Sequence, residues 1–98
     1  MLDKLTYTYF TSLLNETFLI DYQGDDPLEV KLIEVNQIGS VAEEQRQSFS
    51  LIFRSNEQDR YLIQSIYRFE NEKTEPLDLF IVPLGPDKDG MLYEVLFT

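Results

Sequence analysis

The clearest pattern of apolar and polar positions lies at 77–97, where two apolar runs, 77–84 and 91–97, flank a block of turn residues. The first run is apolar on both faces at its centre, because Phe80 and Val82 alternate with other large apolar residues. This is typical of a strand that is covered on both sides. The second run alternates an apolar face with a mixed face that contains Glu94. Together the two runs predict a β-hairpin.

The block between the two runs, GPDKDG, is predicted to be an architectural loop. Gly85 and Gly90 bracket it at the positions where a positive φ is most often needed, and Pro86 fixes φ beside the first glycine. The side chains of Asp87 and Asp89 can accept hydrogen bonds from neighbouring backbone amides. Each residue has a local reason to be in a turn, so we expect any function of the hairpin to lie on its flanks.

A calcium site in this block is not expected. Asp87 and Asp89 followed by a glycine resemble part of a calcium-binding loop, in which a glycine at the sixth position permits the turn. If Gly90 were that glycine, the first and twelfth positions would be Gly85 and Leu96. Neither residue has a side-chain oxygen, so the spacing does not fit.

Glu94 is the candidate interaction residue on the hairpin. It lies among apolar neighbours in the second arm. We expect it either on the exposed face or paired across the sheet with a base such as Arg54 or Arg68. The paired arrangement would make these three residues candidates for contact with a partner.

Helical spacing occurs once upstream of the hairpin. Thr6 is a suitable N-cap, residues 7–14 place apolar side chains on one face, and Asn15 is expected to end the helix. Two helical turns are not stable in isolation. We therefore expect this helix to pack its apolar stripe onto a sheet, as a plug over one open end.

Strand-like alternation fills most of the remaining chain. The alternation slips by one residue near Leu32 and Ile33, which predicts a β-bulge. A polar segment from Ser40 to Gln47 is predicted to be the longest loop. The predicted strands cover 17–22, 28–35, 48–54, 61–70, 77–84 and 91–97, with shorter turns at 23–27, 55–60 and 71–76.

These elements predict a mainly β fold. Six strand candidates follow one short N-terminal helix, which favours an antiparallel meander closed into a small barrel or sandwich. The 98 residues contain no internal repeat and no linker. We expect a single β-rich domain spanning 1–98.

Composition argues against several kinds of chemistry. The chain has no cysteine and no histidine. Their absence removes thiolate zinc sites, the most common ligand of transition metals and the usual base that activates a nucleophile. We therefore expect a protein that is not an enzyme and that holds no metal and no cofactor.

The charge balance limits the partners. Eighteen acidic residues against eight basic ones give a formal net charge of -10, which repels nucleic-acid backbones and anionic membrane surfaces. No apolar run approaches the roughly 20 residues of a membrane span, and the opening residues do not resemble a signal peptide. We expect a cytoplasmic protein that binds neither nucleic acid nor membrane.

Several segments carry a resemblance to a known family. They are Leu5-Thr6, Phe10, Leu13, Phe18, FSLIFRS at 49–55, Tyr67, Glu70 and above all LFIVPLGPDKDGMLYEVLF at 79–97. They resemble an uncharacterised family of small bacterial domains of unknown function, whose closing hairpin has the form L-F-L-V-P-x-G-P-D-x-x-G-x-x-Y-E-A-x-F. Members commonly place an acid three residues after the opening Thr as part of a capping box, whereas this chain has Tyr9 there.

The resemblance implies no catalytic residues, because the family has no established activity. Its members are often encoded near phage-tail-like or tail-collar proteins, which implies a structural or adaptor role. We therefore expect a non-enzymatic module that binds a protein partner. A small-ligand-binding β-barrel and an acidic inhibitor that mimics nucleic acid are the alternatives, and self-association into a homo-oligomer stays open.

Overall fold

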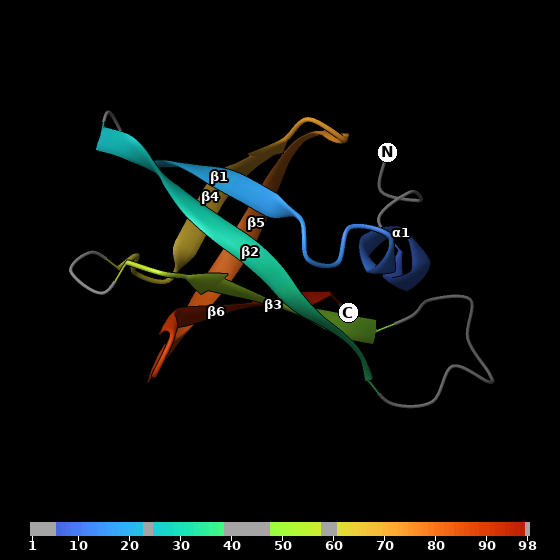
Figure 1. Ribbon diagram of the computed structural model, residues 1–98. Coiled ribbons are helices and arrows are strands. Elements are labelled where there is room, and N and C mark those ends of the chain that lie inside the picture. Colours follow the sequence, from blue (N-terminus) through green and yellow to red (C-terminus); the bar gives the residue numbers. More distant parts are fainter. Residues whose placement is uncertain (1–5, 23–24, 39–47, 58–60, 98) are drawn as a thin grey trace.

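The structure is a computed structural model, which describes residues 6–22, 25–38, 48–57 and 61–97. Figure 1 shows one short helix at one end of a sheet that closes on itself. The expected mainly β fold with one N-terminal helix is confirmed. The elements are α1 (Tyr7–Thr11), β1 (Thr17–Tyr22), β2 (Asp25–Ile38), β3 (Ser48–Ser55), β4 (Ser65–Asn71), β5 (Thr74–Asp87) and β6 (Gly90–Phe97).

The sheet consists of two three-stranded meanders, β1-β2-β3 and β4-β5-β6. Because β6 pairs with β3 and β4 pairs with β1, the order around the closed ring is β1-β2-β3-β6-β5-β4, and all pairs are antiparallel. Ring closure decides between the barrel and the sandwich in favour of an irregular barrel. The expected single meander is wrong, because alternation identifies strands but does not specify which strand lies beside which.

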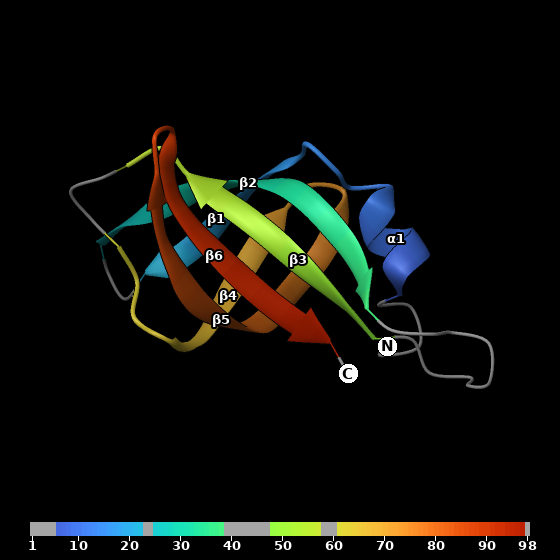
Figure 2. The ribbon, with the colours of Figure 1, turned by 90° about the horizontal axis from the view of Figure 1, so that it is seen from below.

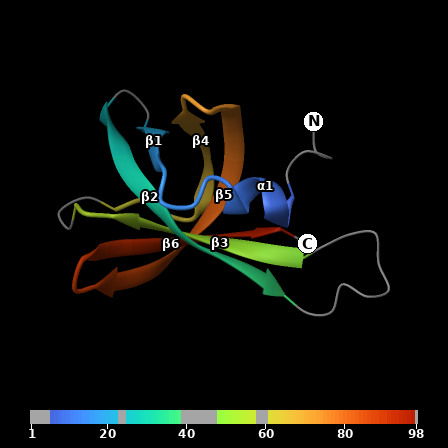
Figure 3. The same cartoon turned by 45° about the vertical axis from the view of Figure 1, so that its right-hand side comes forward.

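The two longest strands make the ring irregular, because each changes partner along its length. β5 pairs with β4 as far as Ile81 and with β6 from Val82 onward, and Figure 3 shows the β4–β5 hairpin standing across the β3–β6 pair. In β2 the register shifts between Leu32 and Glu34, which confirms the bulge predicted near Ile33.

The interior of the ring is filled with apolar side chains, many of them aromatic. Two clusters of phenylalanine side chains stand out. The cluster in the middle of the closed sheet consists of Phe18, Phe53 and Phe69. The cluster at the α1 end consists of Phe10, Phe49 and Phe97. A core of this kind is the main stabilising contribution for a domain of this size.

Side chains close both ends of the ring. At one end α1 inserts the fully buried Phe10, which confirms the predicted plug. At the other end Leu62 is fully buried, and its backbone N–H donates to the hydroxyl of Tyr93 at 2.9 Å. The Tyr67 hydroxyl donates to the carbonyl of Ile63 at 3.0 Å. The two hydroxyls thus hold the segment that covers this end.

The helix is shorter than the expected 7–14. Thr6 is the N-cap as predicted, but α1 ends at Thr11. The hydroxyls of Thr11 and Ser12 donate to carbonyls of the preceding turn, and Leu13 N–H bonds three residues back to Phe10, which tightens the chain into turns. Asn15, with φ of 72°, then reverses the chain.

The strand expected at 61–70 begins only at Ser65. Ile63 was expected to share the buried face, but its side chain is 70% exposed and Leu62 points into the core instead. The residues from Tyr61 to Gln64 cover the open end of the ring as an irregular segment. Their alternation of apolar and polar residues therefore does not correspond to a strand.

The turns are tighter than expected. The β4–β5 turn consists of Glu72 and Lys73, and β5 starts at Thr74. β2 starts at Asp25, inside the turn expected at 23–27, whose first two residues lie outside the described part of the chain. The loop predicted from Ser40 to Gln47 lies outside the described residues as well. Within the described ranges, no helix has the length and apolar character needed to span a membrane.

Candidate interaction surface

The outer face of β2, β3, β6 and β5 carries a row of alternating acidic and apolar residues. Glu34 lies opposite Ile52, Ile52 opposite Glu94, and Glu94 opposite Val82. Figure 2 shows that β3 and β6 run side by side with β5 next to β6. Because neighbouring strands are about 4.8 Å apart, the backbones that carry the two glutamates are about 10 Å apart.

Two large apolar side chains lie beside this row. Phe80 precedes Val82 by two residues on the same face of β5 and is 48% exposed, and Leu96 follows Glu94 by two residues on β6 and is 57% exposed. We call this set the outer patch. It comprises Glu34, Ile52, Phe80, Val82, Glu94 and Leu96.

The outer patch corrects the expectation that the first hairpin arm is covered on both sides. Leu79 and Ile81 are buried in the ring, but Phe80 is half exposed and Val82 is only partly buried. The ring is a single closed sheet whose inner face holds the core, so its outer face meets solvent where no other element packs on it. One face of this apolar run therefore belongs to the core, and the other face forms part of the surface patch.

Of the two arrangements left open for Glu94, pairing with Arg54 or Arg68 is not the one found, because both arginines pair with other acids. Arg54 Nη2 lies 2.6 Å from Asp87 Oδ2, and Arg68 Nε lies 3.5 Å from Asp78 Oδ1. Asp78 is directly opposite Arg68 in the β4–β5 register, so it is the nearer acid. Glu94 is partly buried on the outer face, and in the described parts of the chain no cation is bound to it.

Asp87 ties the tip of the hairpin to β3. Its Oδ1 accepts from the backbone N–H of Asp89 at 2.9 Å while Oδ2 accepts from Arg54. The Arg54 hydrogen bond lowers the pKa of Asp87, partial burial opposes the shift, and the Asp89 amide adds to it. The same hydrogen bond raises the pKa of Arg54. The hydrogen bond to a neighbouring amide that was predicted for Asp87 is present. The ion pair with Arg54 of β3 could not be predicted, because the alternation of apolar and polar residues does not show which side chains meet across the sheet.

The remaining turn residues lie partly inside the strand. β5 continues through Gly85 and Pro86 to Asp87, so the expected six-residue loop reduces to the two-residue turn Lys88-Asp89. Gly85 has φ of 110° beside a register shift in the β5–β6 ladder, and Gly90 has φ of 149°.

Of these two glycines, Gly90 is the one that a neighbour confines. A Cβ on Gly90 would lie 1.8 Å from the carbonyl oxygen of Ser55, whereas a Cβ on Gly85 would meet nothing within 4 Å. Two atoms cannot approach to 1.8 Å without a bond, so glycine at 90 is a packing requirement as well as a conformational one.

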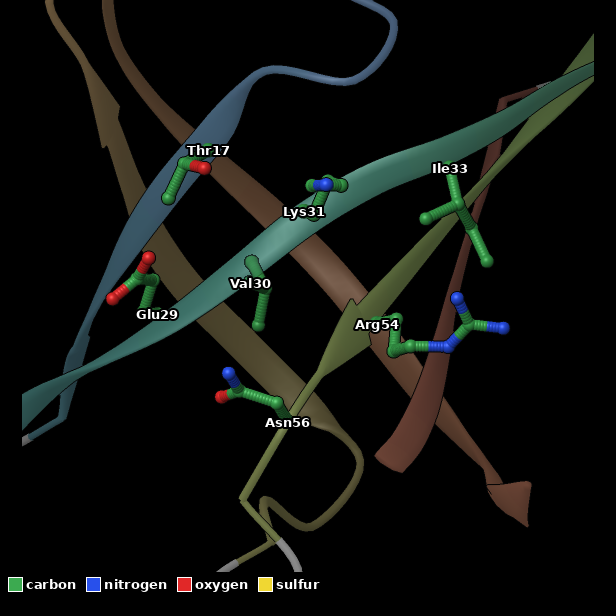
Figure 4. A pocket seen from close by; sticks show the side chains of 7 residues that line it. All are labelled: Thr17, Glu29, Val30, Lys31, Ile33, Arg54 and Asn56. Carbon is green, nitrogen blue, oxygen red and sulfur yellow. The ribbon is translucent and has the colours of Figure 1, made fainter. Parts of the chain in front are cut away.

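A surface pocket of about 190 Å³ lies over β1, β2 and β3. Its volume is below the roughly 300 Å³ at which small-molecule sites begin. In Figure 4 Lys31 lies between Glu29 on one side and Arg54 on the other. Glu29 offsets the charge of Lys31, and Asp87 offsets that of Arg54, so the pocket has no net charge with which to select a ligand. The residues that line it are Thr17, Glu29, Val30, Lys31, Ile33, Arg54 and Asn56.

The described residues contain no cluster of three or more side chains that could hold a metal ion. Of the two acids at the hairpin tip, Asp87 is already engaged, since its carboxylate accepts from both Arg54 and the Asp89 amide. The outer patch offers carboxylates and apolar side chains and no nucleophile next to a base. Carboxylates beside exposed apolar side chains can contact a partner through both charge and apolar surface.

Sequence reasoning selected Glu94 but missed Phe80 and Leu96 as surface residues. Both were assigned to strands correctly, and the usable signal for Phe80 was the apolar character of both faces at 79–82. In a chain of only 98 residues a two-sided apolar strand has too little chain to cover it twice, which favours an exposed apolar face.

Comparison with known proteins gives one result. Residues 5–97 match the family model described as Domain of unknown function (DUF6916). No curated protein and no solved structure matches the chain. The match covers nearly all of the described fold, including every element of the ring, and supports the resemblance to an uncharacterised family of small domains.

Proposed function

This chain belongs to the DUF6916 family of domains of unknown function, and we propose that it is a non-enzymatic protein-interaction or structural adaptor module. The observation that carries the proposal is the outer patch, which exposes Phe80 and Leu96 beside two carboxylates. Large apolar side chains grouped on one face and bordered by polar groups are typical of protein docking sites.

The proposal includes a setting. We place the module in the cytoplasm as a component or adaptor of a phage-tail-like or surface assembly. The support is the resemblance of the closing hairpin at 79–97 to domains that are often encoded near tail proteins. That support is an association between neighbouring genes, so the partner must be found by experiment.

Two alternatives receive less support. A ligand-binding barrel needs an internal cavity, whereas the interior of this ring is filled with aromatic and aliphatic side chains. An inhibitor that mimics nucleic acid needs carboxylates spaced like phosphates. On the outer patch Glu34 and Glu94 are separated by Ile52, which is only 9% exposed, and the exposed Phe80 and Leu96 lie beside them, so the patch combines charge with apolar contact.

The test is partner capture with a matched control. The double variant Phe80→Ser/Leu96→Ser removes both exposed apolar side chains of the outer patch, and Leu19→Ser removes a side chain that is 43% exposed on β1. Chemical cross-linking in the native host, followed by mass spectrometry, should recover a specific partner with the wild type and with Leu19→Ser. The double variant should lose it while keeping a wild-type melting curve. Recovery of the same partner by the double variant would refute the role of the outer patch.

A further inference from the structure

We infer that the outer patch binds a basic amphipathic helix of the partner protein. The inference rests on the proposed function and deepens it, because it states the chemistry and the secondary structure of what docks. Three features of the described residues support it: the charge of the row, the pairing of the strands beneath it, and the spacing of its two glutamates.

The first feature is charge. The row presents Glu34 and Glu94 on either side of Ile52. Asn36 Nδ2 donates to Glu34 at 3.0 Å, which positions that carboxylate without neutralising it. Arg54 also interacts electrostatically with Glu34, but its hydrogen bond and its ion pair are with Asp87. With a net charge of -10 behind it, the patch attracts a cationic partner and repels an anionic one.

The second feature is that both strands under the centre of the patch are already paired. β3 is bonded to β2 and to β6, and β6 is bonded to β3 and to β5. Neither strand has a free edge along the outer patch, so a partner strand cannot add to the sheet there. The partner must dock through side chains onto the face of the sheet.

The third feature is spacing. Glu34 and Glu94 rise from backbones about 10 Å apart. Two residues seven positions apart on a helix are about 10.5 Å apart, whereas residues on one face of a strand are about 7 or 13 Å apart. A helix with basic residues seven apart therefore reaches both glutamates. Its apolar residues three and four positions after the first base then lie over Ile52 and next to Leu96.

The same charges argue against a second copy of this chain as the occupant. A two-fold interface brings one patch against itself, so carboxylates of one copy would approach those of the other. Like charges at an interface are costly, and the net charge of -10 adds long-range repulsion. A partner with basic side chains meets neither obstacle.

The experiment uses a synthetic probe in place of the unidentified partner. The probe is an 18-residue alanine-rich peptide with two lysines seven positions apart and leucines three and four positions after the first lysine, carrying a fluorescent label. A peptide of identical composition whose second lysine follows the first by five positions, and so lies on another side of the helix, is the spacing control. Fluorescence anisotropy of each peptide with the full chain, at about 50 and 300 mM salt, measures affinity and its dependence on screening.

Two double variants separate the outer patch from the general negative charge. Glu34→Gln/Glu94→Gln removes the two patch acids, and Glu72→Gln/Glu75→Gln removes two exposed acids at the β4–β5 turn outside it, with the same change in net charge. We expect the patch variant to weaken binding of the probe about tenfold, the control variant to weaken it less than about threefold, and the spacing control to bind about tenfold more weakly than the probe. High salt should weaken binding to the wild type.

The outcomes distinguish this inference from the proposed function. Equal weakening by the two double variants, or equal binding of the two peptides, would overturn the basic helix. If Phe80→Ser/Leu96→Ser still abolished partner capture in that case, the proposed function would stand and only the inference of a basic helix would fail. If sedimentation showed that the wild type self-associates and that Phe80→Ser/Leu96→Ser is monomeric, the occupant would be a second copy and the inference would be wrong.

Discussion

At the residue scale, the hairpin tip contains two glycines with positive φ that are required for different reasons. Gly90→Ala must both strain the backbone and displace the Ser55 carbonyl, so we expect it to lower the free energy of unfolding by about 3 kcal/mol. Gly85→Ala is the matched control, because it adds strain in open space and should cost about 1 kcal/mol. Urea unfolding of both variants measures the difference, and equal losses would show that packing against Ser55 is not what confines Gly90.

The Arg54–Asp87 pair predicts a pH dependence. The pKa of Asp87 is lower in the folded protein than in the unfolded chain, mainly because Arg54 donates to it. The pair therefore stabilises the fold fully above the ordinary pKa of an aspartate, and the contribution is lost as pH falls through the lowered pKa. Asp87→Asn should melt at a lower temperature than the wild type at pH 7, and the gap should close on acidification. Other acids titrate in both proteins, so a gap that stays constant down to pH 2 would contradict this reading.

At the element scale, the strands were predictable and their ends were not. The alternation of apolar and polar residues located β1, β3 and β6 closely and also located the bulge at Ile33. Both features depend only on which face of the sheet each side chain occupies, and alternation records that directly. The segment containing Leu62 and Ile63 was misassigned because covering the end of a ring is a property of the assembled fold. The ion pair of Asp87 with Arg54 was missed for the same reason, since it joins residues brought together only by closure.

The short helix gives an element-scale prediction. α1 has too few residues to be stable alone, so its free energy comes from packing Phe10 against Phe49 and Phe97. Phe10→Ala should lower the free energy of unfolding by about 3–5 kcal/mol. Leu14→Ala is the control, because Leu14 lies just past the helix and is 38% exposed, and it should cost only about 1 kcal/mol. Guanidinium unfolding followed by circular dichroism measures both, and a small effect at Phe10 would show that α1 does not close the ring.

At the scale of the whole molecule, the end of the ring opposite α1 is closed by a buried hydroxyl. Tyr93→Phe keeps the ring but leaves the buried N–H of Leu62 without the acceptor that the structure gives it. We expect a loss of about 1–3 kcal/mol. Tyr61→Phe alters a mostly exposed tyrosine in the same covering segment and should change stability by less than about 0.5 kcal/mol. Thermal melts compare the two, and a neutral Tyr93→Phe would mean that Leu62 is held by packing alone.

The two meanders are joined to each other by two strand pairings of unequal length, β3–β6 and β1–β4. β3 and β6 pair without interruption from Phe49–Phe97 to Ser55–Met91, whereas the described residues of β1 and β4 pair only at Leu19–Glu70 and Ile20–Phe69. Local opening follows the least costly route, so this short seam should part first.

An opened seam turns a protein without edges into an open six-stranded sheet with two, and free strand edges are templates for aggregation. Amides of β1 and β4 should therefore exchange with deuterium before those of β3 and β6. The side chain of Asn71 connects β4 to β1 by donating to the Thr17 carbonyl at 2.8 Å. Asn71→Ala removes this hydrogen bond, so it should lower the temperature at which the protein aggregates, measured as the onset of light scattering.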